Sequence, residues 1–515
     1  MPPSSPTYRV FGWLFPRGLA AIYIIAYGSW MWQAEALTGE HGIMPVSNLL
    51  KNFAAYAERE GFTPWAQLPT LYWLGYTDEM ARWLCLGGCA AAVLVMAGVL
   101  QGPLLAALWF GYLSICSTGD VFMGYQWDGL LLEAGLIAAV ISPWRLFAGR
   151  IHEALPSPSG LQMLLPQILI FKLMFFSGLL KLTSGDEAWR KLSALKWHYE
   201  TQPIPTWLGW YAHQMPSWMH ELACVTMFVI EMALPVVVML ALLLERFLPA
   251  GFEIFRGIKV VTAAAFAGLM VVVELTGNYT FFNVLTILLA LSVLDDTAWP
   301  GFVCRWLRWT DEAPSLPAWL GYPQRALVCV LLALSILAGA GEILPDKADI
   351  QGARAWVMKQ VAPYRSVNGY GLFRVMTKER NEIVIEVSDD GAYFQPMEFR
   401  WKPGLASRPP PFVAPHQPRL DWQLWFASFN PGYAPQRDAR NARMLWFGGF
   451  MEALLNHNPK VYALLEPPPF PMENIRAVRA KYYRYKFTDS KTRKETGDWW
   501  TVTALGDYSA TFRKR

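Results

Sequence analysis

The stretch LQMLLPQILIFKLMFFSGLLK, residues 161–181, decides the class of fold that this sequence adopts. It holds 21 residues, of which only Lys172 and Lys181 are charged. About 20 predominantly apolar residues in a helix are enough to cross the hydrocarbon core of a bilayer. The stretch therefore predicts a membrane-spanning helix, and it places Lys172 at a depth where a charge is costly.

Eight further segments are apolar enough to cross a bilayer as helices. Together with the first, they predict nine spans, near residues 16–34, 82–101, 103–118, 126–144, 161–181, 218–244, 258–276, 279–295 and 325–344. The composition agrees, because 54% of the 515 residues are hydrophobic and only 16% are charged, far from the balance of a soluble protein. No small-residue cleavage site follows the first apolar run, so we expect that run to be a span and not a signal peptide.

The charges in the loops predict which way the chain crosses the membrane. Basic residues gather in the loops on the side where the chain starts: Arg9, Arg17, Arg145, Arg150, Arg246, Arg256, Lys259, Arg305, Arg308 and Arg325. The opposite loops at 117–125 and 277–278 have no basic residue, and only the loop at 182–217 departs from the pattern. Because basic loops stay in the cytoplasm, nine crossings place the C-terminal end on the non-cytoplasmic side.

Two long loops, 35–81 and 182–217, are predicted on this outer side. The first alternates turn residues with short amphipathic pieces such as residues 49–57. The second contains six aromatic residues, Trp189, Trp197, Tyr199, Trp207, Trp210 and Tyr211. Such a loop either anchors the protein at the membrane interface or covers a cavity, and the sequence leaves both interpretations open.

The character of the sequence changes after Pro345. Apolar and polar side chains alternate on both sides of Asp389-Asp390-Gly391, which predicts a β-hairpin. Strands are expected at 383–387, 393–401, 419–429 and 482–487, and a helix near 440–456. The predicted fold is an α-helical polytopic membrane bundle of about nine spans, residues 1–345, followed by a β-rich, sandwich-like soluble domain, residues 346–515.

The soluble domain is basic, with 26 Lys and Arg against 17 Asp and Glu, which favours contact with anionic lipid headgroups over binding of nucleic acid. It contains none of the six cysteines, so a disulfide scaffold or a C-x-x-C redox site is excluded there. The seven histidines are scattered, and no catalytic or metal-binding motif stands out in the sequence. We therefore predict no metal and no cofactor.

Several charged side chains fall inside predicted spans, where each needs a partner. Glu133 and Lys172 lie at similar depths, about 10 to 14 Å from the outer ends of their helices, so they are predicted to face each other. The pair is either a structural ion pair or part of a polar site, and both interpretations stay open. Glu133, Lys172, Asp128 and Glu274 are the candidates for acid–base chemistry.

Polar residues are also expected at the outer ends of the spans. Six of them could line one vestibule that opens outward: Asp120, Asp128, Glu221, Glu274, Asn278 and Asn283. Asp128 has a second interpretation, as the residue that stabilises the start of its helix.

Six motifs, spread in order over both parts of the chain, resemble the lipase maturation factor family. They are DVFMGYQWDGLLLEAG (120–135), FKLMFFSGLLKLTSG (171–185), WHYETQPIP (197–205), NGYGLF (368–373), EFRWKPG (398–404) and PHQPRLDWQLWF (415–426). The membrane part is also distantly similar to the transmembrane portion of vitamin K-dependent carboxylase.

The resemblance implies a multi-pass protein of the endoplasmic reticulum membrane whose lumenal regions assist the folding of secreted lipases. Short loops and an Ala-, Pro- and Trp-rich composition are typical of a bacterial member, which would sit in the inner (plasma) membrane. The candidate binding residues are those of two motifs: Trp197, His198, Tyr199, Glu200, Gln202, His416, Arg419, Asp421, Trp422 and Trp425.

Three functions are compatible with the sequence. The leading hypothesis is a membrane-anchored maturation factor or chaperone, with membrane lipids and an exported client protein as partners. It predicts an exposed apolar groove near Trp422 and Trp425, or between the outer domain and the loop at 182–217. The alternative is a membrane enzyme acting on a lipid-soluble substrate or quinone, which predicts an enclosed cavity around Glu133, Lys172 and Glu274. A transporter is third, because the two halves show no internal repeat.

Overall fold

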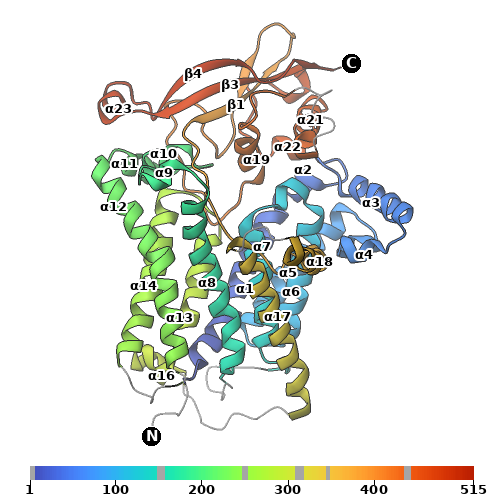
Figure 1. Ribbon diagram of the computed structural model, residues 1–515. Helices are drawn as coiled ribbons and strands as arrows, with labels where there is room; N and C mark the ends of the chain where they lie inside the picture. Colours follow the sequence, from blue (N-terminus) through green and yellow to red (C-terminus); the bar gives the residue numbers. More distant parts are fainter. Residues whose placement is uncertain are drawn as a thin grey trace.

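The computed structural model describes residues 6–147, 157–245, 247, 253–307, 318–343, 348–433 and 442–514. A helical bundle carries a small mixed domain at one end (Figure 1). The loop residues Arg150, Arg246 and Arg308, used above to orient the chain, lie outside the described residues.

The bundle is formed by helices that are distributed over the first two thirds of the chain. They are α1 (Arg9–Met31), α5 (Asp78–Met96), α6 (Gln101–Thr118), α7 (Gln126–Ile141), α8 (Gly160–Thr183), α12 (Ser217–Phe228), the π-helical turn η3 (Val229–Ala233), α13 (Leu234–Leu244), α14 (Glu253–Thr276), α15 (Phe282–Ala290) and α17 (Ala318–Ile343). Short connections are made by η2 (Asp120–Met123), η4 (Leu291–Val293), η5 (Asp296–Ala298) and α16 (Gly301–Trp306).

Within the described residues, six segments are long and apolar enough to cross a membrane. They are Arg9–Met31, Asp78–Met96, Gly160–Thr183, Ser217–Leu244, Glu253–Thr276 and Tyr322–Glu342. The protein is therefore a multi-pass membrane protein, but the predicted number of nine spans is not confirmed.

The three remaining predicted spans are helices that do not meet these criteria. Helix α7 has 16 residues and α15 has 9, so they are about 24 Å and 14 Å long, shorter than the roughly 30 Å hydrocarbon core. Helix α6 reaches 18 residues, and its last seven, from Tyr112 to Thr118, are all buried. The crossing of the membrane by α6, α7 and α15 therefore stays a prediction.

The break in the sixth span has a local cause. In a regular α-helix the ring of Pro235 would collide with the carbonyl group of Glu231, four residues earlier. The π-helical turn η3 lies at this position and widens the backbone between α12 and α13. The span therefore continues past Pro235 as a helix, with one π-helical turn between its two α-helical parts.

Short helices fill the two long outer loops. The first loop forms α2 (Ala34–Thr38), α3 (Val46–Glu60), α4 (Pro64–Gln67) and η1 (Leu71–Leu74), and the second forms α9 (Glu187–Arg190), α10 (Leu195–Thr201) and α11 (Trp207–His213). The expected amphipathic piece at residues 49–57 is part of α3. Both sets of helices lie at the end of the bundle that carries the C-terminal domain (Figure 1).

The C-terminal domain contains one antiparallel sheet in the strand order β2-β1-β3-β4, with β5 also pairing with β3. The strands are β1 (Arg380–Ser388), β2 (Gln395–Met397), β3 (Ala477–Phe487), β4 (Trp500–Asp507) and β5 (Phe512–Arg513). The predicted hairpin is confirmed, because β1 pairs with β2 and the Asp390 carboxylate accepts the backbone N–H groups of Ala392 and Tyr393 in the turn. The strand expected at 482–487 is the second half of β3.

The expected sandwich is wrong for the described residues, because helices cover the sheet in place of a second sheet. The helices of this part of the chain are α18 (Ala348–Val361), η6 (Ala362–Tyr364), α19 (Arg419–Ala427), α21 (Ala442–Leu455), α22 (Pro459–Tyr462), η7 (Met472–Asn474) and α23 (Ser490–Thr496). Of these, α19 and α21 pack on the sheet. The helix expected near 440–456 is α21 from residue 442 onward, and residues 440 and 441 lie outside the described range.

The strand expected at 419–429 is instead the helix α19. Pro418 precedes its first residue, and Leu420, Leu424 and Ala427 are buried on one face at the spacing of an α-helix. The aromatic residues Trp422, Trp425 and Phe426 have a helical spacing as well, so the expected strand overlooked a signal that the sequence contains.

The domain and the start of the chain lie at opposite ends of the bundle. At the first residues of α1, the backbone N–H groups of Arg9 and Val10 donate to Asp296 over 3.1 and 3.0 Å. Beyond its other end, Gln33 donates a hydrogen bond to the carbonyl oxygen of Gln417 in the domain over 2.7 Å. Helix α1 thus extends from the end of the bundle where the chain starts to the end that carries the domain.

Candidate functional site

A buried ion pair joins the domain to the bundle. Arg419 of α19 makes a bidentate contact with Asp128 of α7, with N–O distances of 2.8 and 2.9 Å. Tyr112 donates to the same carboxylate over 2.6 Å, and Arg419 also donates to the carbonyl oxygen of Phe122. Paired, planar contacts of this kind are the strongest and most directional of protein ion pairs. Asp128 is therefore one of the bundle residues that hold the domain in place.

The predicted contact between Glu133 and Lys172 is confirmed. The ammonium nitrogen of Lys172 lies 2.7 Å from Glu133 Oε1, and both side chains are buried. The NGYGLF motif supplies the remaining partners, since Asn368 N–H and the Tyr370 hydroxyl donate to Glu133 Oε2 over 3.1 and 2.7 Å. Lys172 also donates to the carbonyl oxygen of Asn368. Both carboxylate oxygens are therefore engaged, which favours the structural interpretation of the pair.

The WHYETQPIP motif connects α10 to both parts of the protein. The Glu200 carboxylate accepts the backbone N–H of Phe487 in β3 over 3.0 Å, and burial raises the pKa of this carboxyl group. Gln202 donates to the carbonyl oxygen of Thr276, the last residue of α14, over 2.7 Å. The indole N–H of Trp425 donates to the Thr201 carbonyl oxygen. The candidate residues Glu200, Gln202 and Trp425 thus hold the sheet against the bundle.

The aromatic residues of α19 are buried in this junction. The ring of Trp422 meets those of Trp127 at 4.8 Å, Tyr125 at 5.7 Å and Tyr279 at 6.1 Å between centroids. Trp422 and Trp425 are only 3% and 7% exposed. The exposed groove predicted near these two residues is therefore wrong, because α19 turns them toward the bundle.

Two further candidates, His416 and Asp421, have buried polar partners. The imidazole Nδ1 of His416 lies 2.9 Å from the Ser29 hydroxyl, and burial lowers the pKa of His416 to about 4. The Asp421 carboxylate accepts the backbone N–H groups of Trp401 and Lys402, and burial raises its pKa to about 6. The histidine is therefore neutral at pH 7 and acts as an uncharged part of the junction.

We expect the melting temperature of the protein to fall when the pH is lowered from 7 to 5. The folded-state pKa of His416 lies below the ordinary value of 6.5, so between these values the unfolded chain binds more protons. At pH 5 this single group favours unfolding by about 2 kcal/mol. His198 and His213, with pKa values also lowered to about 4 by burial, act in the same direction. Asp421 acts in the opposite direction.

Thermal unfolding of His416→Gln across the same pH range checks this expectation. The variant should show a shallower fall than the unchanged protein, because one of the groups that take up protons on unfolding is gone. An identical pH profile for the two proteins would show that His416 is not the source of the acid sensitivity.

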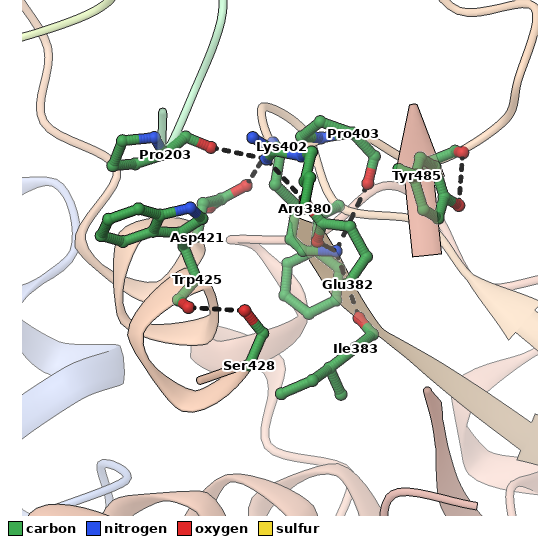
Figure 2. Close-up of polar contacts among 12 residues, drawn as sticks. Pro203, Arg380, Glu382, Ile383, Lys402, Pro403, Asp421, Trp425, Ser428 and Tyr485 are labelled. Carbon is green, nitrogen blue, oxygen red and sulfur yellow. Dashed lines mark hydrogen bonds and ion pairs between the residues drawn. The ribbon is translucent and has the colours of Figure 1, made fainter. Parts of the chain in front are cut away.

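A cluster of buried charges was missed in the sequence. Glu382 of β1 lies between Arg380 and Lys402, at 2.6 and 2.8 Å, and all three side chains are almost fully buried (Figure 2). Arg380 also donates to the carbonyl oxygens of Gln202 and Pro203, so the cluster reaches the second outer loop. Charges two residues apart in a strand share one face of the sheet, and this spacing was the available signal.

The predicted vestibule is not confirmed, because several of its residues make separate contacts. Glu221 pairs with Lys196, and Asn283 donates to Glu274 over 2.5 Å. Asn278 accepts the backbone N–H of Val413 and belongs to the junction. Glu274 and Glu133 therefore have different partners, and the enclosed cavity predicted around Glu133, Lys172 and Glu274 stays a prediction.

A cavity of about 660 Å³ lies elsewhere, between α8, η3, α12 and α14, with α10 at the end toward the domain. Its polar lining includes Lys181, His198, Tyr199, His220, Glu231 and Tyr279. Lys181 and Glu231 form a buried ion pair, in which the ammonium lies 2.7 Å from both carboxylate oxygens. Of the candidate binding residues, His198 and Tyr199 line this cavity, whereas the neighbouring Trp197 is exposed.

These features define a class of protein: a multi-pass membrane bundle with a soluble domain that is fixed to one end by a buried ion pair and edge-to-face aromatic contacts. In the described part of the chain, no group of histidine, cysteine and carboxylate side chains could hold a metal ion.

The chain belongs to the lipase maturation factor family. The family model described as the lipase maturation factor transmembrane domain matches residues 10–301, and that of the C-terminal domain matches residues 366–510. Lipase maturation factor 2 of Homo sapiens is 31% identical, over 95% of this chain and 80% of its own, and that of Gallus gallus is 33% identical, over 95% and 79%. Lipase maturation factor 1 of Mus musculus is 29% identical, over 96% and 85%. No solved structure matches.

Proposed function

We propose that this protein is a membrane-anchored maturation factor that assists the folding of exported lipases. The observation that carries the proposal is the similarity to proteins named lipase maturation factors, which extends over both the bundle and the domain. The junction supports it, because a domain fixed rigidly to a membrane bundle holds a client at a constant distance from the bilayer.

We further propose that the C-terminal domain lies outside the cytoplasm, in the periplasm of a bacterium or in the lumen of the endoplasmic reticulum. The support is geometric and electrostatic. The domain lies at the end of the bundle opposite to the start of α1, and the basic residues Arg9 and Arg17 at that start favour the cytoplasmic side.

An exposed aromatic patch is the surface proposed for contact with the client. It consists of Trp207 and Tyr211 of α11 and Phe412 of the domain, which are between 41% and 49% exposed. The ring of Trp207 lies 6.1 Å from that of Tyr211 and 5.7 Å from that of Phe412. This patch occupies the second of the two places where an apolar surface was expected, between the domain and the loop at 182–217. A contiguous apolar surface suits an incompletely folded chain.

The experiment is a rescue of lipase secretion. Cells that lack their own lipase maturation factor would express this protein together with a lipase, and the activity of the secreted lipase would be measured per unit of lipase protein. We expect the activity to rise when the protein is present. A lipase that is equally active without it would overturn the proposed function.

Removing the patch should weaken this rescue. We expect the double variant Trp207→Ala, Phe412→Ala to need about 30-fold more protein for the same lipase activity, because two aromatic anchors contribute about 2 kcal/mol to a protein interface. Trp65→Ala, which removes an exposed aromatic ring from α4 on the other outer loop, is the matched control. If the double variant and the control behave alike, the client binds elsewhere.

A further inference from the structure

The 660 Å³ cavity opens toward the bilayer. Helix α13 and the turn η3 pack on α14, but α12 diverges from it, and the cavity lies in the gap. The lining residues Leu222 of α12 and Val272 of α14 are 57% and 55% exposed, although both helices belong to membrane spans. Exposed apolar side chains on such spans contact lipid tails. A molecule that fills this cavity therefore comes from the membrane and not from water.

The serine and threonine hydroxyl groups that line the cavity are already engaged. Ser177, Thr226, Thr276 and Thr286 each donate a hydrogen bond to a carbonyl oxygen four residues earlier in their own helix. These side chains offer the cavity a mainly apolar surface. The occupant must consequently be apolar over most of its length.

The two charges at the cavity compensate each other. Both oxygens of Glu231 contact the Lys181 ammonium, which also lies 5.3 Å from the centre of the Trp189 ring. A charged headgroup placed here would lose its water without gaining a counter-charge. The π-helical turn that presents Glu231 is of a kind that occurs frequently at functional sites.

His198, which lines the cavity, has one ring nitrogen that is free to accept a hydrogen bond. Tyr279 donates its hydroxyl hydrogen to Gln202 over 2.9 Å, so its oxygen is an acceptor for His198 Nε2 at 3.3 Å. This arrangement puts the proton of His198 on Nε2, and burial lowers the pKa of His198 to about 4, so the ring is neutral. In the described part of the chain, Nδ1 has no hydrogen-bond partner and remains an acceptor.

We propose that this cavity binds an uncharged acyl lipid, whose chain fills the space between α12 and α14 and whose hydroxyl headgroup donates to His198 Nδ1. The cavity has the size of a small-molecule site, which is about 300 to 1,000 Å³. A diacylglycerol has the required chemistry, an acyl chain with one free hydroxyl group. This binding site is independent of the contact with a lipase client.

Gly268 of α14 allows the cavity to be filled without disturbing the fold. It lines the cavity, and a Cβ atom added there meets nothing within 4 Å. Gly257 is the matched control, because it lies on the same helix, also in open space, and does not line the cavity. The two positions are 11 residues apart in sequence, about three turns, so they share a face of the helix and lie about 16 Å apart. Replacing a glycine inside a helix also favours the helix.

The test is photo-crosslinking of the full-length protein in lipid nanodiscs with a diacylglycerol that carries a diazirine on its acyl chain. We expect labelled peptides from α12 and α14, and at least about a tenfold loss of labelling in Gly268→Phe, a factor that corresponds to about 1.4 kcal/mol. Gly257→Phe should label like the unchanged protein. Equal labelling of the two variants would overturn the proposal.

Two further comparisons test the headgroup. A phosphatidylcholine with the same diazirine chain should label these peptides much less, and equal labelling would mean that any bilayer chain enters the cavity. His198→Phe keeps an aromatic ring against Phe373 but removes the acceptor. It should reduce labelling by the diacylglycerol and leave labelling by its acetylated, hydroxyl-free form unchanged. Equal losses for both probes would overturn the role of His198.

Discussion

The variant Arg419→Ala is expected to lose about 3 to 5 kcal/mol of folding free energy, because it leaves the Asp128 carboxylate buried without a counter-charge. The guanidinium group contacts both carboxylate oxygens, and neither residue reaches solvent. The measurement is the melting temperature in detergent, followed by intrinsic tryptophan fluorescence, together with the yield of monodisperse protein in size-exclusion chromatography.

The matched control is Arg479→Ala, on β3 of the same domain. Arg479 also makes a short contact with a carboxylate, 2.7 Å from Glu386, but its side chain is partly exposed. Pairs of this kind contribute at most about 1 kcal/mol. If both arginine variants lowered the melting temperature equally, burial would not be the cause of the larger loss.

A double variant distinguishes the net contribution of the ion pair to stability from the cost of leaving one buried charge without a partner. Arg419→Met combined with Asp128→Leu removes both charges, and replacing a buried pair by apolar residues is often close to neutral. We expect most of the lost stability to return. The hydroxyl group of Tyr112 and the carbonyl oxygen of Phe122 lose a partner in this variant, so the recovery should be incomplete.

The second large effect is expected at Glu133. The substitution Glu133→Gln keeps an acceptor for Asn368 and Tyr370 but leaves the ammonium of Lys172 buried beside a neutral amide, at a cost of about 3 kcal/mol or more. The measurement is again the melting temperature, with the exposed pair variant Lys191→Ala as the control that should not change it.

The combined variant Glu133→Gln, Lys172→Met decides between the two interpretations of this pair. If the pair is structural, as its saturated hydrogen bonds favour, removing both charges restores the melting temperature and the rescue of lipase secretion together. A variant that regains stability but not the rescue would show that the charges take part in the function.

The contact between Glu133 and Lys172 could be predicted because the constant rise of a helix converts sequence position into depth. The pairing of Arg419 with Asp128 could not, because 26 basic residues of the domain were available and no local pattern indicates which of them reaches the bundle. Six spans could be predicted from length and apolar composition, and the crossings expected at α6, α7 and α15 stay predictions.

The helix α19 and the large cavity show two other limits. In α19 the aromatic residues Trp422, Trp425 and Phe426 already have the i, i+3, i+4 spacing of a helix, so the expected strand overlooked a signal that the sequence contains. The cavity lies where α12 diverges from α14, next to the π-helical turn before Pro235. An interhelical angle leaves no periodic signal in a sequence.

The sequence separation of the residues in the two buried ion pairs determines the order in which the pairs can form during translation. Lys172 follows Glu133 after 39 residues, but Arg419 follows Asp128 only after 291. At about 5 to 20 residues per second, a ribosome needs about 15 to 60 seconds to make that interval. During this time the nascent bundle holds an acid whose partner does not yet exist, so the membrane part completes its assembly only after translation has passed residue 419.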